Sequence, residues 1–284
     1  MLAEMTTALR AGELRAMELE ATIAGSASQF ATKLANQPPG AVLLDSYRNR
    51  TKIINAASGS PVVLFDDHFN PPKSISVIIN ASPSATAHQY DGSQKILLGP
   101  KYASLHRAFR VARTRFHVRE TIRTILVALG GNDTAGNLPF VASTLLQIFP
   151  NARLMVCGSP GAVVPEHPRI LRKEWLNQPD MAGLMSSCDM AVLAGGQMLV
   201  QAACIGLPAL ALPQSSNQSL HAASWQDTGS VVMVEEVSGL QAAASLLLPK
   251  QRRSRMSVMG RSAVDGRGAA RVANKLIHLA NAAN

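Results

Sequence analysis

Two glycine turns, each at the end of an apolar run, have the residue types and spacing best suited to holding a phosphate. In the first, "ILVALGGNDTAGN", the apolar run ends at Gly130 and Gly131, and Asp133 follows. Glycine has no Cβ, so backbone N–H groups beside it can approach a ligand closely. A helix that begins here, capped by Asn132 or Asp133, leaves its positive N-terminus for an anion such as phosphate. Taken alone, this stretch favours a plain strand-to-helix turn.

The second turn repeats the pattern. In "AVLAGGQMLVQAACIG" the apolar run ends at Gly195 and Gly196, and Gln197 opens the helical segment that follows. The next apolar run, "PALALP", is followed by "QSSNQ", which contains Asn217 and Gln218. Ligands of open α/β sheets bind at the carboxyl ends of the strands. We therefore expect the two glycine turns to form two walls of one crevice.

The segments that carry these turns alternate between strand-like and helix-like patterns. The apolar runs are continuous and lack period-two alternation, which is typical of strands buried on both faces of a parallel sheet. Helical spacing lies between them, and the C-terminal stretch indicates one or two helices broken at Gly266 and Gly268. This succession predicts an α/β, doubly wound fold. The predicted strands lie in "AVLLDSY", "PVVLFDD", "SISVIIN", "KILLGPKY", "TILVALGG", "ARLMVCGS", "MAVLAGG", "PALALPQ" and "VVMVEE".

The composition is that of a folded, basic protein. Of 284 residues, 47% are hydrophobic and 16% charged, and 27 basic residues against 18 acidic ones give a net charge of +9. Residues 107–123 form an arginine-rich run whose one acid is Glu120. We interpret the run as a solvated basic connector, with a small anionic ligand or an acidic partner as the alternatives. A nucleic-acid partner is not expected, because no aromatic stacking set or known module accompanies the run.

Cysteine usage and hydropathy indicate a cytoplasmic protein. Cys157, Cys188 and Cys204 lie in apolar stretches without a CxxC spacing, which predicts buried, reduced thiols. No apolar run reaches the roughly 18 residues of a membrane span, and no signal peptide is seen. The isolated Glu166 and His167 lack a third ligand at metal-site spacing. We expect no metal, no cofactor, and a monomer or weak dimer.

Ten short motifs occur in order between Leu43 and Val272. They are "LLDSY", "FDD", "VIIN", "QYDG", "LLGPKYASLHRAF", "LVALGGND", "MAGLMSSCDMAVLAGG", "CIGLPALAL", "SSNQ" and "VDGRGAARV". With these motifs the sequence resembles the UDP-2,4-diacetamido-2,4,6-trideoxy-beta-L-altropyranose hydrolases of pseudaminic acid biosynthesis and their spore coat polysaccharide relatives. It is also similar to the UDP-sugar-binding half of GT-B glycosyltransferases that act in peptidoglycan synthesis. The resemblance implies a GT-B-like pair of Rossmann-like domains, which we place at residues 1–115 and 116–284.

The resemblance also implies roles for individual residues. Asp45 and Tyr47, in the D-x-Y motif, are expected to serve the sugar and the attacking water from the N-terminal domain. The C-terminal domain is expected to hold UDP, with the glycine turns at its diphosphate. The implied UDP and sugar ligands are Gly130, Gly131, Asp133, Gly195, Gly196, Gln197, Gln201, Asn217 and Gln218.

Two departures from the family pattern bear on activity. The family begins with a strand and a G-x-G-H-x-x-R loop whose histidine is taken as the catalytic base, and this sequence has no such motif. "MLAEMTTALRAG" resembles the helix after that loop, so we expect the N-terminal domain to lack its first strand. Gln201 stands where the family has a ribose-binding glutamate, which loses a charge-assisted hydrogen bond. Two other histidines, His68 and His88, have a suitable pKa for a base but are interpreted as solvated loop residues.

The sequence therefore predicts a nucleotide-sugar hydrolase-like protein that releases UDP and a free diacetamido sugar. As written, the chain is expected to be impaired because the histidine loop is absent. A GT-B glycosyltransferase that uses a UDP-sugar and a non-catalytic nucleotide-sugar-binding or scaffold protein are the alternatives.

Overall fold

The computed structural model describes residues 27–46, 50–57, 59–67, 70–90, 94–130, 133, 135–158, 163–173 and 176–283. Contacts divide the chain into two compact units. Unit 1 comprises Met1–Asn80, Thr86–Leu98 and Val272–Asn284, and unit 2 comprises Ala81–Ala85 and Gly99–Arg271. Within the described ranges, no helix is long and apolar enough to cross a membrane. The expected opening helix, in residues 1–12, lies outside these ranges.

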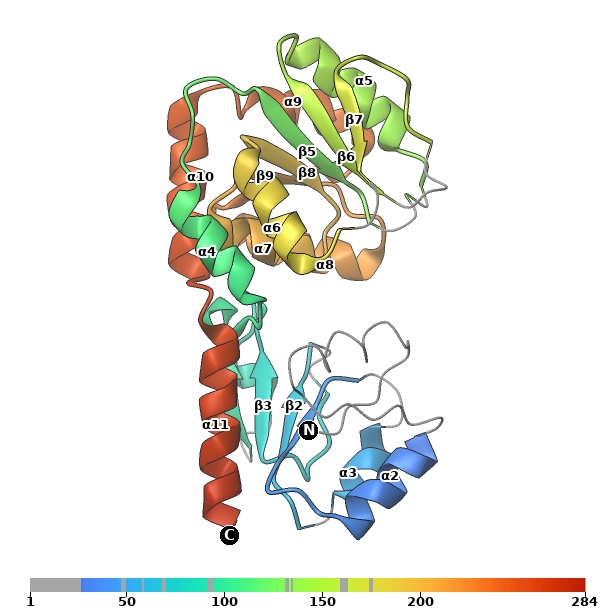
Figure 1. The fold of residues 1–284 in the computed structure, drawn as a ribbon, viewed down its shortest axis with the longest axis vertical. Helices are drawn as coiled ribbons and strands as arrows, with labels where there is room; N and C mark the ends of the chain where they lie inside the picture. Colours follow the sequence, from blue (N-terminus) through green and yellow to red (C-terminus); the bar gives the residue numbers. More distant parts are fainter. Residues whose placement is uncertain are drawn as a thin grey trace. The chain divides into compact units, whose positions relative to one another are not determined.

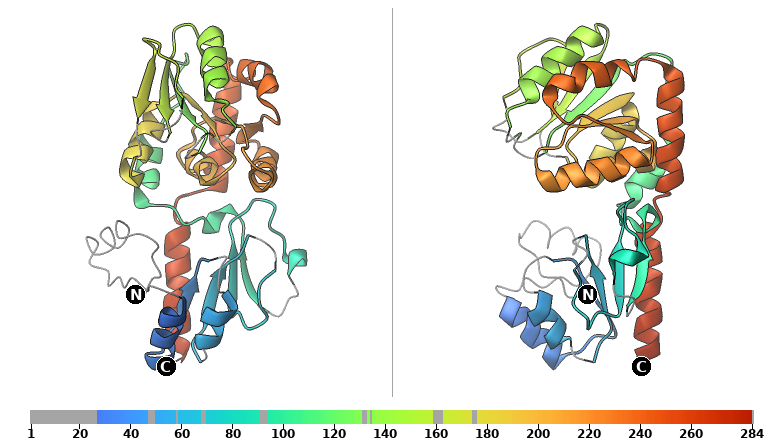
Figure 2. Two further views of the ribbon diagram at one scale, coloured as in Figure 1. Left: turned by 90° about the vertical axis from the view of Figure 1, so that its right-hand side faces the viewer. Right: turned by 180° about the vertical axis from the view of Figure 1, so that it is seen from behind.

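Unit 1 is built on a parallel sheet of four strands in the order β1-β2-β3-β4. Leu64 and Ile78, on the two central strands, are buried against Leu34 and Ile53 of the helices. Helices α2 and α3 lie on one side of the sheet and the C-terminal part of α11 on the other (Figures 1 and 2). The elements are α2 (Ala27–Asn36), β1 (Val42–Leu44), α3 (Arg50–Ala56), β2 (Val62–Phe65), β3 (Val77–Asn80), η1 (Ala87–Gln89) and β4 (Lys95–Leu98).

Unit 2 is built on a parallel sheet of six strands in the order β10-β9-β8-β5-β6-β7. The chain starts at the central strand β5, moves outward to β6 and β7, and then returns to β8 on the other side of β5. The order in which strands are added to the sheet thus reverses between β5 and β8. Open α/β sheets bind ligands at such a switch point. The strands are β5 (Thr124–Ala128), β6 (Arg153–Cys157), β7 (Ile170–Lys173), β8 (Met190–Leu193), β9 (Ala209–Ala211) and β10 (Val231–Met233).

Helices cover both faces of the unit 2 sheet (Figure 1). Along β5, Leu126 is buried in the cluster that contains Met185 of α6, whereas Ile125 and Val127 are buried with Leu145 of α5. This two-sided burial explains the continuous apolar runs in the sequence. The remaining elements are η2 (Pro100–Tyr102), α4 (Arg107–Arg115), α5 (Leu138–Ile148), α6 (Gln178–Ser187), α7 (Gln197–Ile205), α8 (Ser216–Asp227), η3 (Val237–Gly239), α9 (Leu240–Ser245), α10 (Lys250–Ala263) and α11 (Gly268–Ala283).

The predicted fold class is confirmed: both units are parallel sheets covered by helices. The break near Gly266 and Gly268 is present, between α10 and α11. Helix α4, at the predicted domain boundary of 115/116, packs inside unit 2, because Phe109 and Ala112 are buried with the unit 2 core. The boundary between domains at that point stays a prediction.

The arginine-rich run has a structural role at two of its residues. Arg113 donates from one guanidinium nitrogen to the carbonyl oxygens of Cys204, Arg261 and Val264, at the C-terminal ends of α7 and α10. Arg119 forms a 3.0 Å ion pair with Asp189, which is buried before β8. Cations at helix C-termini and beside buried carboxylates stabilise the fold. Besides its predicted role as a basic connector, the run therefore stabilises the fold of unit 2 through these two arginines.

Candidate functional site

The two glycine turns lie next to each other at the carboxyl edge of the unit 2 sheet. Strands β5 and β8 pair in parallel, and the backbone N–H of Ala194 donates to the carbonyl oxygen of Ala128 at 3.0 Å. The chain enters the first turn at Gly130 and the second at Gly195. The sequence placed these turns as two walls of one crevice, and within unit 2 they are neighbours at the switch point of the sheet.

The turn after β5 uses its acid to close the following helix. Gly130 has a φ of +86°, a conformation that favours glycine, and Asp133 has a φ of +40°. The two carboxylate oxygens of Asp133 accept from the backbone N–H groups of Asn137 and Leu138, at 3.1 and 2.9 Å. Gly131 lies outside the described residues. The N-cap residue of α5 is Asn137, so Asp133 holds the start of the helix from four residues upstream and is not itself the N-cap.

These hydrogen bonds reduce the number of N–H groups that the start of α5 can offer to an anion. The carboxylate of Asp133 accepts from the N–H groups of Asn137 and Leu138, and it places a negative charge at the positive end of α5. In addition, a proline lies in the first turn of α5 and brings no N–H group. An anion at this N-terminus therefore stays a prediction, with fewer free donors than the sequence suggested.

Helix α7, after β8, has an open N-terminus. Its N-cap is Gly196, without a side-chain cap, and no acidic side chain lies in its first turn. A Cβ built on Gly196 meets no atom within 4 Å, so this point is open. Among the described residues, no hydrogen bond uses the backbone N–H of Gly196 or Gln197. Such uncapped donors with the positive end of the dipole are favourable for an anion.

The predicted residues Asn217 and Gln218 begin the next helix, α8, at the end of β9. The amide oxygen of Gln218 accepts from the backbone N–H of Gln214 at 2.9 Å. The hydroxyl of Ser215 donates to the amide oxygen of Asn217 at 2.6 Å. Since β9 neighbours β8 in the sheet, the starts of α7 and α8 lie at the same edge. Their side chains thus shape this edge through local hydrogen bonds.

A histidine that the sequence did not single out supports the second turn. The Nδ1 of His221, on α8, lies 2.7 Å from the carbonyl oxygen of Gly195. The indole Nε1–H of Trp225 donates to its Nε2 at 3.1 Å. The i, i+4 spacing of His221 and Trp225 was the available signal, because residues at that spacing share one helix face.

Gln201 points its amide at the start of α6. It is buried, 5% exposed, and its Nε2 donates to Oε1 of Gln178 at 3.1 Å. The amide oxygen of Gln201 is buried without a hydrogen-bond partner. A buried unpaired acceptor costs free energy, so a hydrogen-bond donor placed beside this oxygen would stabilise it. The contact with a ribose that the family resemblance implies stays a prediction.

Unit 1 places acids at the carboxyl end of its own sheet. The carboxyl of Asp66, after β2, forms a 3.1 Å ion pair with Arg50, and its second oxygen is buried without a partner. Partial desolvation raises the pKa of the Asp45 carboxyl, the nearby Asp67 raises that pKa further, and Arg50 lowers it. The second predicted catalytic residue, Tyr47, lies outside the described residues, as does His68.

The carboxyl edge of β3 carries a hydrogen-bonded pair of neutral side chains. The amide of Asn80 donates to the hydroxyl of Tyr90 at 3.0 Å, and both residues are buried. Burial is the largest cause that raises the pKa of Tyr90. His88, weighed as an alternative base, is exposed on η1. Among the residues that the structure describes, no three His, Cys, Asp or Glu side chains gather as a metal site would require.

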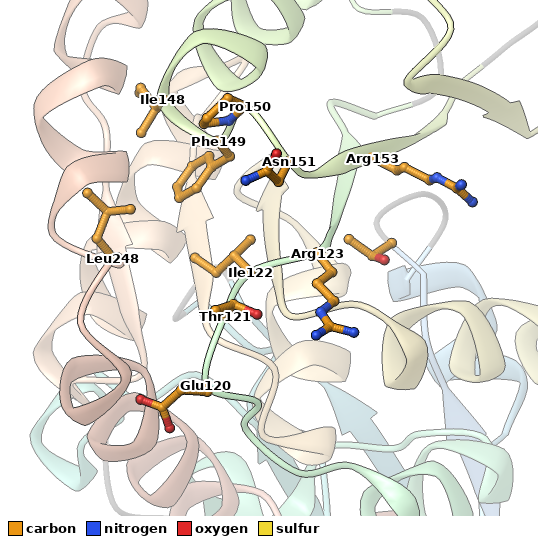
Figure 3. Close-up of a pocket in the computed structure, with 11 residues that line it drawn as sticks. Glu120, Thr121, Ile122, Arg123, Ile148, Phe149, Pro150, Asn151, Arg153 and Leu248 are labelled. Carbon is orange, nitrogen blue, oxygen red and sulfur yellow. The ribbon is translucent and has the colours of Figure 1, made fainter.

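A pocket of about 720 Å³ lies at the opposite, amino-terminal edge of the unit 2 sheet. Thr124 and Arg153, the first residues of β5 and β6, lie on its wall. Figure 3 shows Phe149 and Leu248 on one side of the pocket, and Arg123 and Arg153 on the other. The glycine turns end the same sheet at its other edge, so this pocket is separate from the candidate site.

The sequence has a curated relative. It is 32% identical over 200 residues to the spore coat polysaccharide biosynthesis protein SpsG of Bacillus subtilis (strain 168). The match covers 64% of this chain and 58% of SpsG, so the chain spans less than two thirds of that relative. No protein-family model matches the chain. The expected resemblance to the spore coat polysaccharide group is confirmed by this match in sequence.

Solved structures with the same fold are more distant in sequence. MurG of Acinetobacter baumannii matches with a TM-score of 0.66 at 14% identity, over 98% of this chain and 90% of that one. The MnaA–UDP co-structure from S. aureus matches with a TM-score of 0.71 at 14% identity, over 97% and 87%. UDP-GlcNAc 2-epimerase from Neisseria meningitidis, bound to UDP-GlcNAc, matches with a TM-score of 0.70 at 12% identity, over 93% and 87%. These likenesses show that the chain shares its fold with these proteins, as the predicted fold class implied.

Proposed function

We propose that unit 2 binds the diphosphate of a UDP-sugar at its carboxyl edge, between the ends of β5 and β8. The observation that carries the proposal is the uncapped N-terminus of α7, which opens at Gly196 beside the Gly130 turn. Helix N-termini with free N–H groups favour phosphate. The UDP and UDP-GlcNAc named for two of the solved neighbours support the choice of nucleotide. Gly130, Gly131, Gly195, Gly196 and Gln197 are the proposed neighbours of the phosphates.

The other assigned residues take supporting places in this proposal. Gln201 is assigned to the ribose, and Asn217 and Gln218 to the sugar and phosphate end. Asp133 shapes the first turn by capping α5, so its side chain contributes through the backbone that it holds. These assignments rest on the family resemblance and on the positions of the residues at one edge of unit 2.

The proposed reaction is hydrolysis of the nucleotide sugar in the biosynthesis of a surface polysaccharide. The oxygen of a water attacks C1 of the sugar, the bond between C1 and the phosphate oxygen breaks, and UDP leaves with the bonding electron pair. The proton of the water passes to a carboxylate, for which we propose Asp45, with Tyr47 near it in the chain. A carboxyl whose pKa is raised toward neutrality is a better base at neutral pH. The homology to SpsG supports the polysaccharide context.

Calorimetry with UDP and with uridine tests the binding proposal. We expect UDP to bind more tightly than uridine, and Gly196→Val to weaken UDP, because a branched side chain would enter the open point at the start of α7. Equal affinity of the unaltered chain and Gly196→Val for UDP would refute this site. Incubation of the chain with a UDP-diacetamido sugar then tests the reaction. Release of UDP in water alone supports the hydrolase, whereas release only with an added sugar or lipid acceptor supports a glycosyltransferase.

A further inference from the structure

The contact between His221 and the second glycine turn defines the protonation of the histidine ring. Trp225 has one polar atom, an indole N–H that can only donate. Because this N–H donates to Nε2 of His221 at 3.1 Å, that nitrogen is the acceptor. In the neutral ring the proton is therefore on Nδ1, and Nδ1–H donates to the carbonyl oxygen of Gly195 at 2.7 Å.

Trp225 holds the histidine ring in place. The indole is 0% exposed and is packed in the main core cluster of unit 2. The two rings meet edge to face, with centroids 6.2 Å apart and planes at 73°. A ring with hydrogen bonds on both nitrogens and a rigid neighbour loses little further freedom when its partner is fixed. The carbonyl of Gly195 is thus tied to the core through two side chains of α8.

The orientation of this carbonyl decides where the next N–H group points. In a trans peptide the C=O and the following N–H lie in one plane and point in opposite directions. With the Gly195 oxygen held by His221, the N–H of Gly196 is directed away from α8. No described residue accepts from this N–H, and the space beside Gly196 is open. The bond from His221 therefore presents a free donor at the mouth of α7.

A turn of two glycines needs such support more than other turns do. Glycine has the widest choice of backbone angles, and fixing it costs more conformational entropy than fixing any other residue. A turn that is ordered before its ligand arrives spares the complex this cost and binds more tightly. Packing contributes on the Gly195 side, where the backbone of Gln218 is in close contact. The hydrogen bond from His221 sets the orientation of the Gly195–Gly196 peptide.

We propose that His221 is a positioning residue for phosphate recognition, acting through the Gly195–Gly196 peptide. The inference rests on the proposed function, because the group that accepts from the Gly196 N–H is taken to be the diphosphate of the nucleotide. In this role His221 does not contact the phosphate itself but holds the backbone that does. It also predicts that the effect of His221 depends on the phosphates of the ligand and not on its uridine.

Two variants separate the donor from the volume of the ring. In His221→Asn the amide Nδ2 takes the place of Nδ1 and keeps a donor for Gly195. In His221→Leu the volume is better kept, but the donor is lost. We expect His221→Leu to bind UDP about tenfold more weakly, the usual scale for one hydrogen bond, and to bind uridine with unchanged affinity. His221→Asn is expected to recover most of the UDP affinity.

The measurements are calorimetric titrations of the full chain with UDP and with uridine, together with thermal unfolding of each variant. Long-range ¹H–¹⁵N NMR of the histidine rings gives an independent signature, since it shows which ring nitrogen carries the proton. We expect Nδ1 in the unaltered chain and in the UDP complex. A ring protonated on Nε2 alone would overturn the inference.

The binding outcomes distinguish the inference from the proposed function. If the unaltered chain does not bind UDP, the proposed function fails and the inference fails with it. If the chain binds UDP and His221→Leu binds it equally well, only the inference fails. If both variants lose UDP and uridine to the same extent, or if Asn is worse than Leu, the histidine fills space and does not position the turn.

Discussion

Gly195 lies against the backbone of Gln218 so closely that a side chain at Gly195 has no room. A Cβ built on Gly195 would lie 2.9 Å from the carbonyl carbon of Gln218 and 2.9 Å from its Cβ. Two segments that follow neighbouring strands thus pack against each other closely, because residue 195 has no side chain. This contact fixes the turn after β8 to the first turn of α8, and it makes the glycine a requirement of the fold.

The first prediction follows from this contact. Gly195→Ala is expected to lower the free energy of unfolding of unit 2 by about 1–3 kcal/mol, the usual cost of forcing a methyl group into a packed site. Trp225 is buried in the core of unit 2, so tryptophan fluorescence during urea unfolding measures the change. Gly183→Ala is the matched control. Gly183 lies exposed in the middle of α6 with nothing within 4 Å of a built Cβ.

The control should change stability in the other direction. Alanine in a helix interior is more stable than glycine by roughly 0.5–1 kcal/mol, so Gly183→Ala is expected to raise the free energy of unfolding. Equal stability of Gly195→Ala and the unaltered chain would show that the turn can move away from Gln218. The turn after β8 would then not be the rigid element that the proposed phosphate site requires.

The second prediction tests charge at the start of α7. Gly196→Asp places a carboxylate at an N-cap, which is a favourable position and raises stability by a few tenths of a kcal/mol. The same carboxylate occupies the helix donors and repels a phosphate, so UDP is expected to bind about tenfold more weakly or worse. Gly196→Asn, of nearly equal shape but neutral, is the control. The contrast in UDP affinity between the two variants, measured by calorimetry, isolates the charge.

Uridine completes this test. Because uridine has no phosphate, its affinity is expected to be the same in Gly196→Asp and Gly196→Asn. A loss of UDP affinity of the same size in both variants would indicate a change of shape. No loss in either variant would place the phosphate elsewhere on the protein.

The sheet and both glycine turns were predictable because strands buried on both faces have a clear sequence pattern. Runs such as "TILVALGG" are apolar without interruption, since residues on both faces of the strand are covered, and glycine marks where the strand ends. Strand β7 was missed for the opposite reason. Arg172 and Lys173 in it are exposed, and an edge strand half in water needs no apolar run.

The side-chain roles at the site were less predictable than the turns. Asp133 was expected to cap α5, but an acid at a strand end gives no sign of whether it meets a ligand or its own helix. Here both of its oxygens are used by the helix. His221 was missed because its partners, the carbonyl of Gly195 and the indole of Trp225, meet only after β8 and α8 are packed together. Long-range hydrogen bonds of this kind leave little trace in local sequence.

The third prediction concerns Gln201. Replacing it with Glu puts a carboxylate in a site that is 5% exposed, next to the amide of Gln178. A desolvated carboxylate is disfavoured in its charged form, so the ligand-free variant is expected to be less stable than the unaltered chain at neutral pH. With nucleotide bound, a charge-assisted hydrogen bond to a ribose hydroxyl is expected to tighten binding by about 1 kcal/mol.

The ligands again separate the interpretations. Ribose is common to UDP and uridine, so Gln201→Glu is expected to tighten both, unlike changes at the phosphate turn. Gln201→Met, an apolar residue of similar length, is the control and is expected to tighten neither. If calorimetry shows unchanged or weaker binding of both ligands to Gln201→Glu, the side chain does not face the ribose.

The last prediction is a pH dependence of stability carried by Asp265 and Arg271. The guanidinium of Arg271 donates to both carboxylate oxygens of Asp265, at 2.8 and 2.6 Å, and the backbone N–H of Arg267 donates at 2.9 Å. These hydrogen bonds, with that of Arg271 as the largest cause, lower the pKa of Asp265 to about 2 from its ordinary 3.8. Arg271 also donates to the carbonyl oxygen of Lys101, so the pair connects α11 to the segment before α4.

The sign of the effect follows from the lowered pKa. Folding favours the charged carboxylate, so its stabilisation is fully present above pH 3.8 and is lost as the pH falls through about 2. Because both side chains are more than a third exposed, solvent screens the pair, and we expect a contribution of up to about 1 kcal/mol.

Asp265→Asn is therefore expected to be less stable than the unaltered chain at neutral pH, and the difference is expected to shrink below pH 3.8. Glu235→Gln, an exposed carboxylate elsewhere in unit 2, serves as the control in urea unfolding followed by tryptophan fluorescence. A difference between Asp265→Asn and the unaltered chain that stays constant as the pH falls to about 2 would mean that the ion pair does not link protonation to folding.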